Sequence, residues 1–346
     1  MIYIVTGSTG FVGNNVVKAL EARGDVVVAM AQTPAKVARA LKGTRARIVY
    51  GDVLKKDKLE LLFCEAKKAA EGSDKTTKTE LTVIHTASVV YLGGDKKKLQ
   101  RMREVNIDGA KNIIELCLRH KCRLLYVSSV HAIPEAPNRG VITETKEFDH
   151  KKVIGKYAKT KAEASQLVMD AVKNKGLDAV MVHPSAISGP HDYSNTHTTQ
   201  VVQDYKDGRI PVATKGGYDF VDVRDVTTGI LAACEKGKKG DCYLLTNRYY
   251  TVKHILNTLH ILGVGKQVRR SVPRALAKMS LPIMAIHNKF ARKRPLYNSY
   301  ALYTLGSNSN FSHEKATCEL GYAPRELQES LRDTVKFLEK QDREKR

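Results

Sequence analysis

Long hydrophobic runs are missing from this sequence of 346 residues. Its longest apolar stretches are Ile2 to Val5, Val26 to Ala31 and Leu281 to Ile286, far below the roughly 20 residues that a membrane-spanning helix requires. The chain also starts directly with an apolar run, without the charged segment, hydrophobic segment and cleavage site of a secretory signal peptide. We therefore expect no membrane span and a location in the cytoplasm.

Cysteine is scarce as well, and the six cysteines form no Cys-x-x-Cys pair. A chain of this size does not need a disulfide framework, so we expect reduced and mostly buried thiols. Cys117, His120 and Cys122 come nearest to a metal-ligand spacing, but they lie within a predicted core helix. His191 and His197 share a polar loop and lack a third ligand. The sequence therefore predicts no metal site.

Acidic residues are too few to balance the basic ones, since 58 Lys and Arg against 36 Asp and Glu give a net charge of +22. Such a charge attracts anions, which include nucleic acid, an anionic membrane surface, a phosphorylated cofactor and an acidic substrate. The basic residues are dispersed, with the densest runs at Lys96 to Lys98 and Arg292 to Arg294, and no aromatic residues stand between them to stack on bases. This pattern disfavours nucleic acid as a partner.

The first 180 residues alternate short β-branched runs with longer amphipathic segments, a pattern typical of βαβ units and a parallel sheet. The expected strands are Ile2 to Val5, Val26 to Met30, Arg47 to Tyr50, Thr82 to His85, Arg123 to Ser128 and Asp178 to His183. The clearest expected helices are Val12 to Arg23, Leu99 to Arg119 and Lys156 to Asn174. A polar loop follows at residues 188–199, and we expect Phe220 to Val223 to return to the sheet.

These patterns predict an α/β protein with a doubly wound parallel sheet and a smaller C-terminal substrate-binding lobe. The dinucleotide-binding, Rossmann-type domain is expected to hold residues 1–187 and about 219–250. The lobe is expected to hold about 188–218 and 251–340.

A glycine-rich loop follows the first predicted strand and leads into the first predicted helix. Its members are Gly7, Ser8, Thr9, Gly10, Phe11, Val12 and Gly13. Three glycines at this spacing permit a tight turn, a close approach of the backbone to a pyrophosphate, and close packing of helix on strand, while the helix N-terminus supplies amide donors. The loop therefore predicts a bound dinucleotide.

The end of the second predicted strand bears on the choice of cofactor. NAD-preferring proteins usually place an acid there, which binds the adenosine ribose. This chain has Gln32 between Ala31 and Thr33, and Lys36 and Arg39 follow closely. Because no carboxylate is present to repel a 2′-phosphate, we expect NADP in preference to NAD.

Tyr157 and Lys161 lie four residues apart on a predicted helix and therefore share a face. A phenol with a pKa near ~10 needs a nearby cation to give up its proton near neutral pH, and Lys161 supplies it. Tyr249 and Lys253 repeat the same spacing, so the motif alone is weak. Ser129 distinguishes the first pair from the second, because it ends the strand before the Tyr157 helix and can polarise a substrate carbonyl.

Five segments, in chain order TGSTGFVG, YVSSVHA, YAKTKAEA, HPSAISGP and FVDVRDV, resemble the extended short-chain dehydrogenases/reductases, the NAD-dependent epimerase/dehydratase family. The resemblance implies that Gly7, Gly10 and Gly13 bind pyrophosphate. It adds further cofactor-binding residues, with Asp52 at the adenine and Pro184 at the nicotinamide: Asp52, Val53, Thr86, Ala87, Ser88, Asn106 and Pro184. It also implies a homodimer.

The details are most similar to the dihydroflavonol reductase and 3β-hydroxysteroid dehydrogenase branch. Nucleotide-sugar dehydratases carry Thr-Asp-Glu where this chain has Ser129-Val130-His131. The resemblance implies hydride transfer to a ketone or aldehyde, with Ser129, Tyr157 and Lys161 as catalytic residues and a small carbonyl compound, which the charge would favour as an anion, as substrate. Residues 188–199 and 273–303 are expected to line the pocket. A nucleotide-sugar epimerase with bound NAD and a non-catalytic NAD(P)-binding regulatory protein remain as alternatives.

Overall fold

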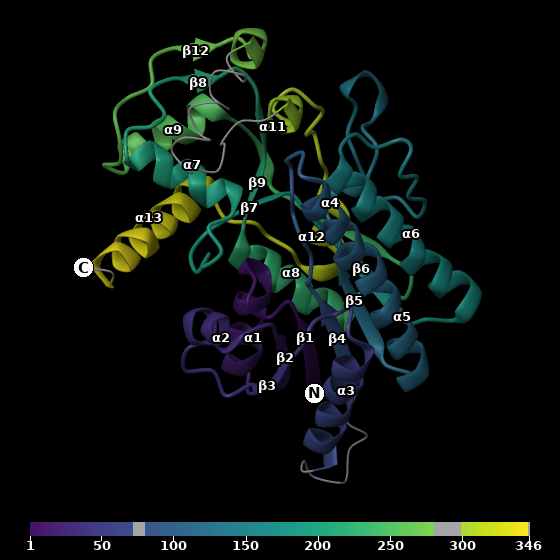
Figure 1. Cartoon of the computed structure of the whole chain (residues 1–346). Helices are drawn as coiled ribbons and strands as arrows, with labels where there is room; N and C mark the ends of the chain where they lie inside the picture. The colour runs from purple at the N-terminus through teal and green to yellow at the C-terminus, as the bar shows by residue number, and fades with distance from the viewer. Residues whose placement is uncertain (72–79, 280–298, 345–346) are drawn as a thin grey trace.

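The computed structural model describes residues 1–71, 80–279 and 299–344, and its centre is a seven-stranded sheet (Figure 1). The strand order is β10-β6-β5-β4-β1-β2-β3, and every neighbouring pair is parallel. The strands are β1 (Ile2–Thr6), β2 (Val26–Ala31), β3 (Arg47–Tyr50), β4 (Leu81–His85), β5 (Arg123–Val127), β6 (Ala179–Pro184) and β10 (Cys242–Leu245). The doubly wound fold that the sequence predicts is confirmed.

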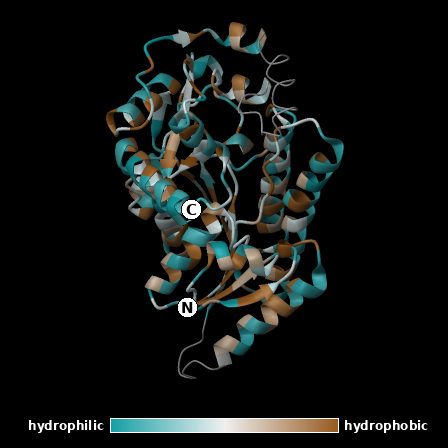
Figure 2. Cartoon of the chain, turned by 60° about the vertical axis from the view of Figure 1, so that its left-hand side comes forward, coloured by the Kyte–Doolittle hydropathy of each residue, from teal (hydrophilic) through white to brown (hydrophobic). Residues whose placement is uncertain are grey.

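Helices cover both faces of this sheet, as a parallel sheet with apolar strands requires. One face is covered by α3 (Lys56–Glu71), α5 (Gly109–His120) and α6 (Lys156–Lys175). The other face is covered by α1 (Phe11–Ala22), α8 (Val223–Lys236) and α12 (Glu314–Leu320). Hydrophobic residues gather on the strands between the two layers (Figure 2). The short α2 (Pro34–Ala40) follows β2.

The long helix expected from Leu99 to Arg119 is interrupted. Helix α4 (Lys96–Arg103) passes into a π-helical turn, η1 (Glu104–Asp108), before α5 begins. Such turns often occur at functional sites. Here the turn carries Asn106, which is 1% exposed and faces the inside of the molecule.

A second unit lies beyond the carboxyl ends of the central strands (Figure 1). Its sheets are β11-β9-β7 and β12-β8, and three of its helices, α7, α9 and α13, pack around a third apolar cluster. Its elements are β7 (Ala186–Ser188), α7 (His197–Lys206), β8 (Ala213–Thr214), β9 (Gly217–Asp222), β11 (Arg248–Thr251), α9 (Val252–Ile261), β12 (Ser271–Val272), α11 (Ser299–Thr304) and α13 (Leu327–Glu344). Part of the expected pocket lining, residues 280–298, lies outside the described residues.

The expected return of Phe220 to Val223 to the central sheet is wrong. Phe220 belongs to β9, which pairs antiparallel with β11 and parallel with β7, while β10 provides the seventh strand of the central sheet. Asp222 ends β9 and caps α8 by accepting a hydrogen bond from the amide of Arg224 at 2.7 Å. The Asp225 carboxylate, in the first turn of α8, has another partner.

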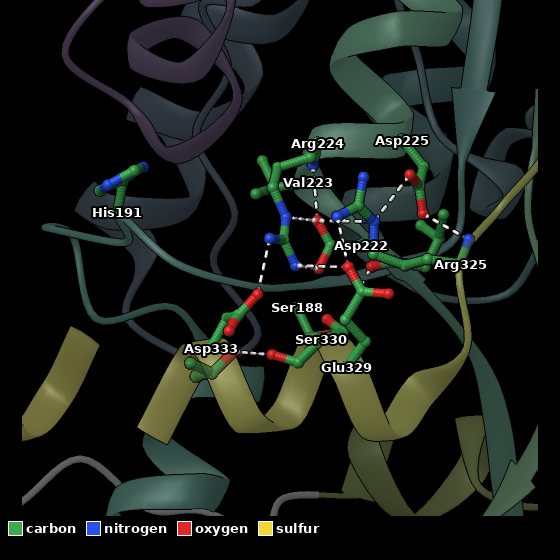
Figure 3. Close-up of polar contacts among 12 residues, drawn as sticks. Ser188, His191, Asp222, Val223, Arg224, Asp225, Arg325, Glu329, Ser330 and Asp333 are labelled. Atoms are coloured by element: carbon green, nitrogen blue, oxygen red, sulfur yellow. Dashed lines mark hydrogen bonds and ion pairs between the residues drawn. The ribbon is translucent and has the colours of Figure 1, made fainter. Parts of the chain in front are cut away.

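That partner is Arg325, in a buried ionic network that fastens the C-terminal segment to β9 and α8 (Figure 3). Arg325 donates to Asp225 through its main-chain amide at 2.8 Å and its guanidinium at 2.9 Å. Arg224 binds Asp222 and reaches Asp333 of α13 at 2.7 Å, and these bonds raise the pKa of its guanidinium. Since Asp222 and Asp225 are at most 5% exposed, the two arginines are their essential counter-charges.

No helix within the described ranges, 1–71, 80–279 and 299–344, is both long enough and apolar enough to cross a lipid bilayer.

Candidate active site

The glycine loop between β1 and α1 is closed by very tight backbone contacts. Gly7 has a φ of +67°, and a Cβ atom on it would lie 2.6 Å from the amide nitrogen of Ala87. A Cβ atom on Gly13 would lie 2.2 Å from the Gly7 carbonyl oxygen. The amide of Gly10 donates to that same oxygen at 2.8 Å. A side chain at Gly7 or Gly13 would therefore force the loop and helix apart.

The N-terminus of α1 remains uncapped by any side chain, because Gly10 holds the N-cap position. The first amides of this helix are thus available to an anion, and the aligned peptide dipoles favour one. The narrow glycine turn and the uncapped helix together fit the pyrophosphate of a dinucleotide. The site's main chain, and not its side chains, would hold that group.

Several predicted loop residues are turned inward. The buried Ser8 hydroxyl donates to a backbone carbonyl of β2 at 2.7 Å, which anchors the loop to its neighbouring strand. Phe11 and Val53 are also buried in the core. Thr9 and Val12 are half-exposed.

At the adenosine end, the predicted residues are linked to one another. The side-chain nitrogen of Gln32 lies 3.4 Å from Asp52 Oδ2, and Lys36 donates to the side-chain oxygen of Gln32. Asp52 also accepts from the amide of Leu54 at 3.0 Å and forms an ion pair with Arg101 of α4. Sequence reasoning missed Arg101, whose only signal was the basic composition of residues 96–103.

The residues after β4 connect that strand to the catalytic helix. The Thr86 hydroxyl donates to the Thr6 carbonyl at 2.7 Å, and the Ser88 hydroxyl donates to Asn106 Oδ1 at 3.1 Å. The Asn106 side-chain nitrogen reaches the Thr160 hydroxyl at 3.0 Å. The amide of Asn106 is thus engaged within the protein, and it positions the loop and α6.

Ser129, Tyr157 and Lys161 meet where β5 ends and α6 begins. The hydroxyls of Ser129 and Ser88 are hydrogen-bonding neighbours that lower the pKa of the Tyr157 phenol. One turn later on α6, the Lys161 ammonium, whose residue is 3% exposed, donates to the Val127 carbonyl at 2.9 Å. The structure therefore brings together the three residues that the sequence singled out, and it adds Ser88 as a fourth polar group at the phenol.

Burial acts on both titratable groups of this set. It lowers the pKa of the Lys161 ammonium from its ordinary 10.5 to about 7, because the charged form has lost its water. It raises the pKa of the Tyr157 phenol to about 12, and the hydrogen bonds from Ser129 and Ser88 oppose that rise. The phenol is therefore protonated at neutral pH and ready to act as an acid.

The second Tyr-x-x-x-Lys match has a different structure. Tyr249 is exposed on β11, whereas Lys253 lies on α9 and donates to the Arg269 carbonyl at 3.0 Å. The two side chains thus belong to different elements and do not share one helical face. Of the two pairs, only Tyr157 and Lys161 lie four residues apart on one helix, α6.

Pro184 ends β6 and is buried. The next residue, Ser185, donates its hydroxyl to Asp219, which also accepts from the amide of Asn247 at 3.0 Å. Burial raises the pKa of Asp219 to about 6, and these two bonds counteract part of that rise. The carboxylate thereby joins β9 to the residue between β6 and β7 and to the segment after β10.

Sequence reasoning missed an aromatic cluster beside Tyr157. The ring of His131 lies edge-on to Tyr157, with centroids 6.0 Å apart, and stacks on Tyr218 at 5.5 Å. Tyr300 of α11 lies 5.9 Å from the same imidazole. Phe311 closes one side, edge-on to Tyr218 at 6.3 Å. These residues come from four separate segments, so no local spacing announces them.

Comparison with known proteins identifies the family of this chain. The family model described as the NAD dependent epimerase/dehydratase family matches residues 3–246. The chain belongs to this family. Its members are NAD(P)-dependent oxidoreductases, epimerases and dehydratases, which confirms the resemblance read from the sequence motifs.

Two relatives span nearly the whole chain. "Sterol demethylase protein B" of Methylococcus capsulatus is 29% identical over 343 residues, which cover 98% of either chain. The 3-beta-hydroxysteroid dehydrogenase of Mycolicibacterium neoaurum is 24% identical over 336 residues, which cover 93% of this chain and 86% of the relative.

Solved structures share the fold. The crystal structure of gox2253 superposes with a TM-score of 0.80 at 25% identity and covers 99% of both chains. The Thermus thermophilus UDP-glucose 4-epimerase, solved as a complex with NAD, superposes with a TM-score of 0.73 at 20% identity, covering 98% of this chain and 99% of that one.

Proposed function

We propose that this protein is an NAD(P)H-dependent reductase of a ketone or aldehyde, with NADP as its preferred cofactor. The observation that carries the proposal is the meeting of the Tyr157 phenol, the Ser129 hydroxyl and the buried Lys161 beside an uncapped helix N-terminus behind a glycine turn. The dehydrogenase among the relatives supports an oxidoreductase activity.

Each catalytic residue has a distinct task in this reaction. A bound reduced nicotinamide supplies the hydride that the substrate carbonyl carbon accepts. Ser129 donates a hydrogen bond to the carbonyl oxygen and orients it, and Tyr157 delivers the proton to that oxygen as negative charge develops there. Lys161 then stabilises the phenolate that remains, because its ammonium lies on the same face of α6. Ser88 also lowers the pKa of this phenol.

The preference for NADP follows from charge at the adenosine end. Lys36 and Arg101 lie around Gln32 and Asp52, and Arg101 already pairs with the carboxylate. Lys36, by contrast, bonds the neutral side chain of Gln32 at the end of β2. A 2′-phosphate at this place would gain a charge-assisted hydrogen bond from it.

The test measures NADPH and NADH absorbance with the purified chain and a panel of ketones, aldehydes, acyl-CoA esters and nucleotide sugars. We expect NADPH consumption that requires a carbonyl compound. Tyr157→Phe is expected to lower kcat by roughly a hundred- to ten-thousandfold, the usual contribution of a positioned general acid. Tyr249→Phe, in the second Tyr-x-x-x-Lys match, is the matched control and is expected to retain the wild-type rate.

Two results would overturn the proposal. Interconversion of a nucleotide sugar without any consumption of reduced cofactor would identify an epimerase instead. Cofactor binding without turnover of any compound in the panel would favour a regulatory NAD(P)-binding protein. Equal activity of Tyr157→Phe and the wild type would refute the assigned acid whatever the substrate.

A further inference from the structure

The hydroxyls of Tyr218 and Tyr300 both bond the imidazole of His131 beside the catalytic tyrosine. The Tyr218 hydroxyl lies 3.1 Å from His131 Nε2 and 3.4 Å from Nδ1, and the Tyr300 hydroxyl lies 3.2 Å from Nδ1. Burial lowers the pKa of His131 to about 4, so the ring is neutral and carries a single N–H at neutral pH. One ring nitrogen therefore accepts a hydrogen bond and the other donates one.

The burial of the two tyrosines decides the direction of this chain of hydrogen bonds. Tyr218 is 7% exposed, and among the described residues its hydroxyl has His131 as its hydrogen-bond partner. A buried hydroxyl must use its proton, so Tyr218 donates to Nε2. The ring proton then lies on Nδ1 and points to the oxygen of Tyr300. The hydrogen of the Tyr300 hydroxyl, on a half-exposed side chain, is left to donate elsewhere.

Tyr300 lies close to the reacting phenol. A Cβ atom on Gly155, two residues before Tyr157, would lie 2.0 Å from the Tyr300 ring, so α11 packs directly on the turn that starts the catalytic helix. A charge on Tyr157 would also act on Tyr300 and raise its pKa, although burial is the larger cause of that rise. The Tyr157 and Tyr300 rings also lie against the same imidazole, with centroids 6.0 and 5.9 Å from that of His131, so a substrate held by one phenol lies beside the other.

We propose that Tyr300, oriented by Tyr218 and His131, donates a hydrogen bond to a second oxygen atom of the substrate, next to the carbonyl that Tyr157 protonates. This inference rests on the proposed reductase function and names its substrate class: carbonyl compounds with an oxygen function on a neighbouring carbon. The donor is a neutral phenol beside aromatic rings, which suits a ketone, hydroxyl or ester oxygen. Tyr300 is thus a specificity-determining residue, and His131 and Tyr218 are positioning residues.

The test compares two pairs of probes with matched skeletons: acenaphthenequinone with acenaphthenone, and camphorquinone with camphor. The first compound of each pair has a second oxygen on the adjacent carbon, and the second compound does not. For each variant, kcat/KM with NADPH is divided by the wild-type value for the same probe, which removes differences in intrinsic reactivity. Losing one neutral hydrogen bond corresponds to a roughly three- to tenfold loss.

Three variants of the full chain separate the roles. Tyr300→Phe is expected to lose roughly three- to tenfold more on the two-oxygen probes than on their one-oxygen partners. Tyr218→Phe should show the same selective loss, because His131 can then accept from Tyr300 and take up its free proton. Tyr303→Phe is the matched control on the same helix, since its hydroxyl bonds Glu135 instead, and it should change both probes of a pair equally.

The outcomes distinguish this inference from the proposed function. Equal losses of Tyr300→Phe on both probes of each pair would refute Tyr300 as a second hydrogen-bond donor and leave the proposed reductase function intact. A wild type that reduces other compounds of the panel but none of these probes would do the same. A selective loss in Tyr300→Phe without one in Tyr218→Phe would refute the relay through His131. If the wild type consumed NADPH with none of the carbonyl compounds in the panel, the proposed reductase function itself would be refuted. Unfolding midpoints equal to wild type would show that the variants are folded.

Discussion

Replacing Lys161 by Met should make the protein more stable and inactive at once. Met preserves most of the length and volume of the side chain but removes its charge. The side chain is 3% exposed, and burial lowers the pKa of its ammonium from 10.5 to about 7. The protein therefore holds a poorly solvated cation at its proposed active site, as catalytic residues often require.

The magnitude follows from the pKa. A lowering of about 3.5 units, at roughly 1.4 kcal/mol per unit, means that the charged form destabilises the fold by at most about 5 kcal/mol below pH 7. The substitution also removes the hydrogen bond to the Val127 carbonyl, worth about 2 to 3 kcal/mol for a charged donor. The variant should thus gain roughly 2 to 3 kcal/mol in free energy of unfolding at pH 6.

The gain must shrink as the pH rises. Between pH 7 and 10.5 the unfolded wild type binds a proton that the folded wild type has released, so wild-type stability rises through this window. Over the two units from pH 7 to 9 that rise is about 3 kcal/mol, which cancels the advantage of the variant. The Met variant has no such group and should lack this slope.

The assay is urea unfolding of the wild type and Lys161→Met without cofactor at pH 6 and pH 9, followed by circular dichroism. We expect a higher midpoint for the variant at pH 6 and nearly equal midpoints at pH 9. A variant that is less stable at pH 6, or a difference that stays constant with pH, would contradict the reasoning. NADPH turnover, measured in parallel, should be lost at both pH values.

Three further predictions test other parts of the structure. Gly13→Ala places a Cβ atom 2.2 Å from a backbone oxygen. It should weaken NADPH binding, measured by fluorescence, at least tenfold, which corresponds to roughly 1.4 kcal/mol. The control Gly94→Ala, whose Cβ atom meets nothing within 4 Å, should bind NADPH as the wild type does. Lys36→Glu should lower kcat/KM for NADPH roughly tenfold while sparing NADH, because it replaces a cation by an anion beside the expected 2′-phosphate; equal effects on both cofactors would argue against that position. Arg325→Leu removes the cationic partner of the buried Asp225 carboxylate and should lower the free energy of unfolding by about 3 kcal/mol. Arg248→Leu breaks an exposed pair and should lower it by less than about 1 kcal/mol.

Local sequence patterns predicted much of the fold. Each expected strand of the first 184 residues exists, with bounds within one residue, because buried parallel strands are short apolar runs that stand out between amphipathic helices. The glycine loop could be recognised because strand, turn and helix are adjacent in sequence. Local reasoning erred at Phe220, because a strand's composition does not say which sheet it will join.

The sequence by itself determined the elements of the doubly wound sheet, the glycine turn, and the shared face of Tyr157 and Lys161, since each is signalled by residues close along the chain. Only the tertiary structure decided the partners of distant side chains. The ion pair of Arg101 with Asp52 and the fastening of α13 by Arg325 join residues at least 49 positions apart. The contact of His131 with Tyr300 spans 169 positions. No period or spacing encodes such contacts, because they arise only when the packed sheet and lobe bring the separate segments together.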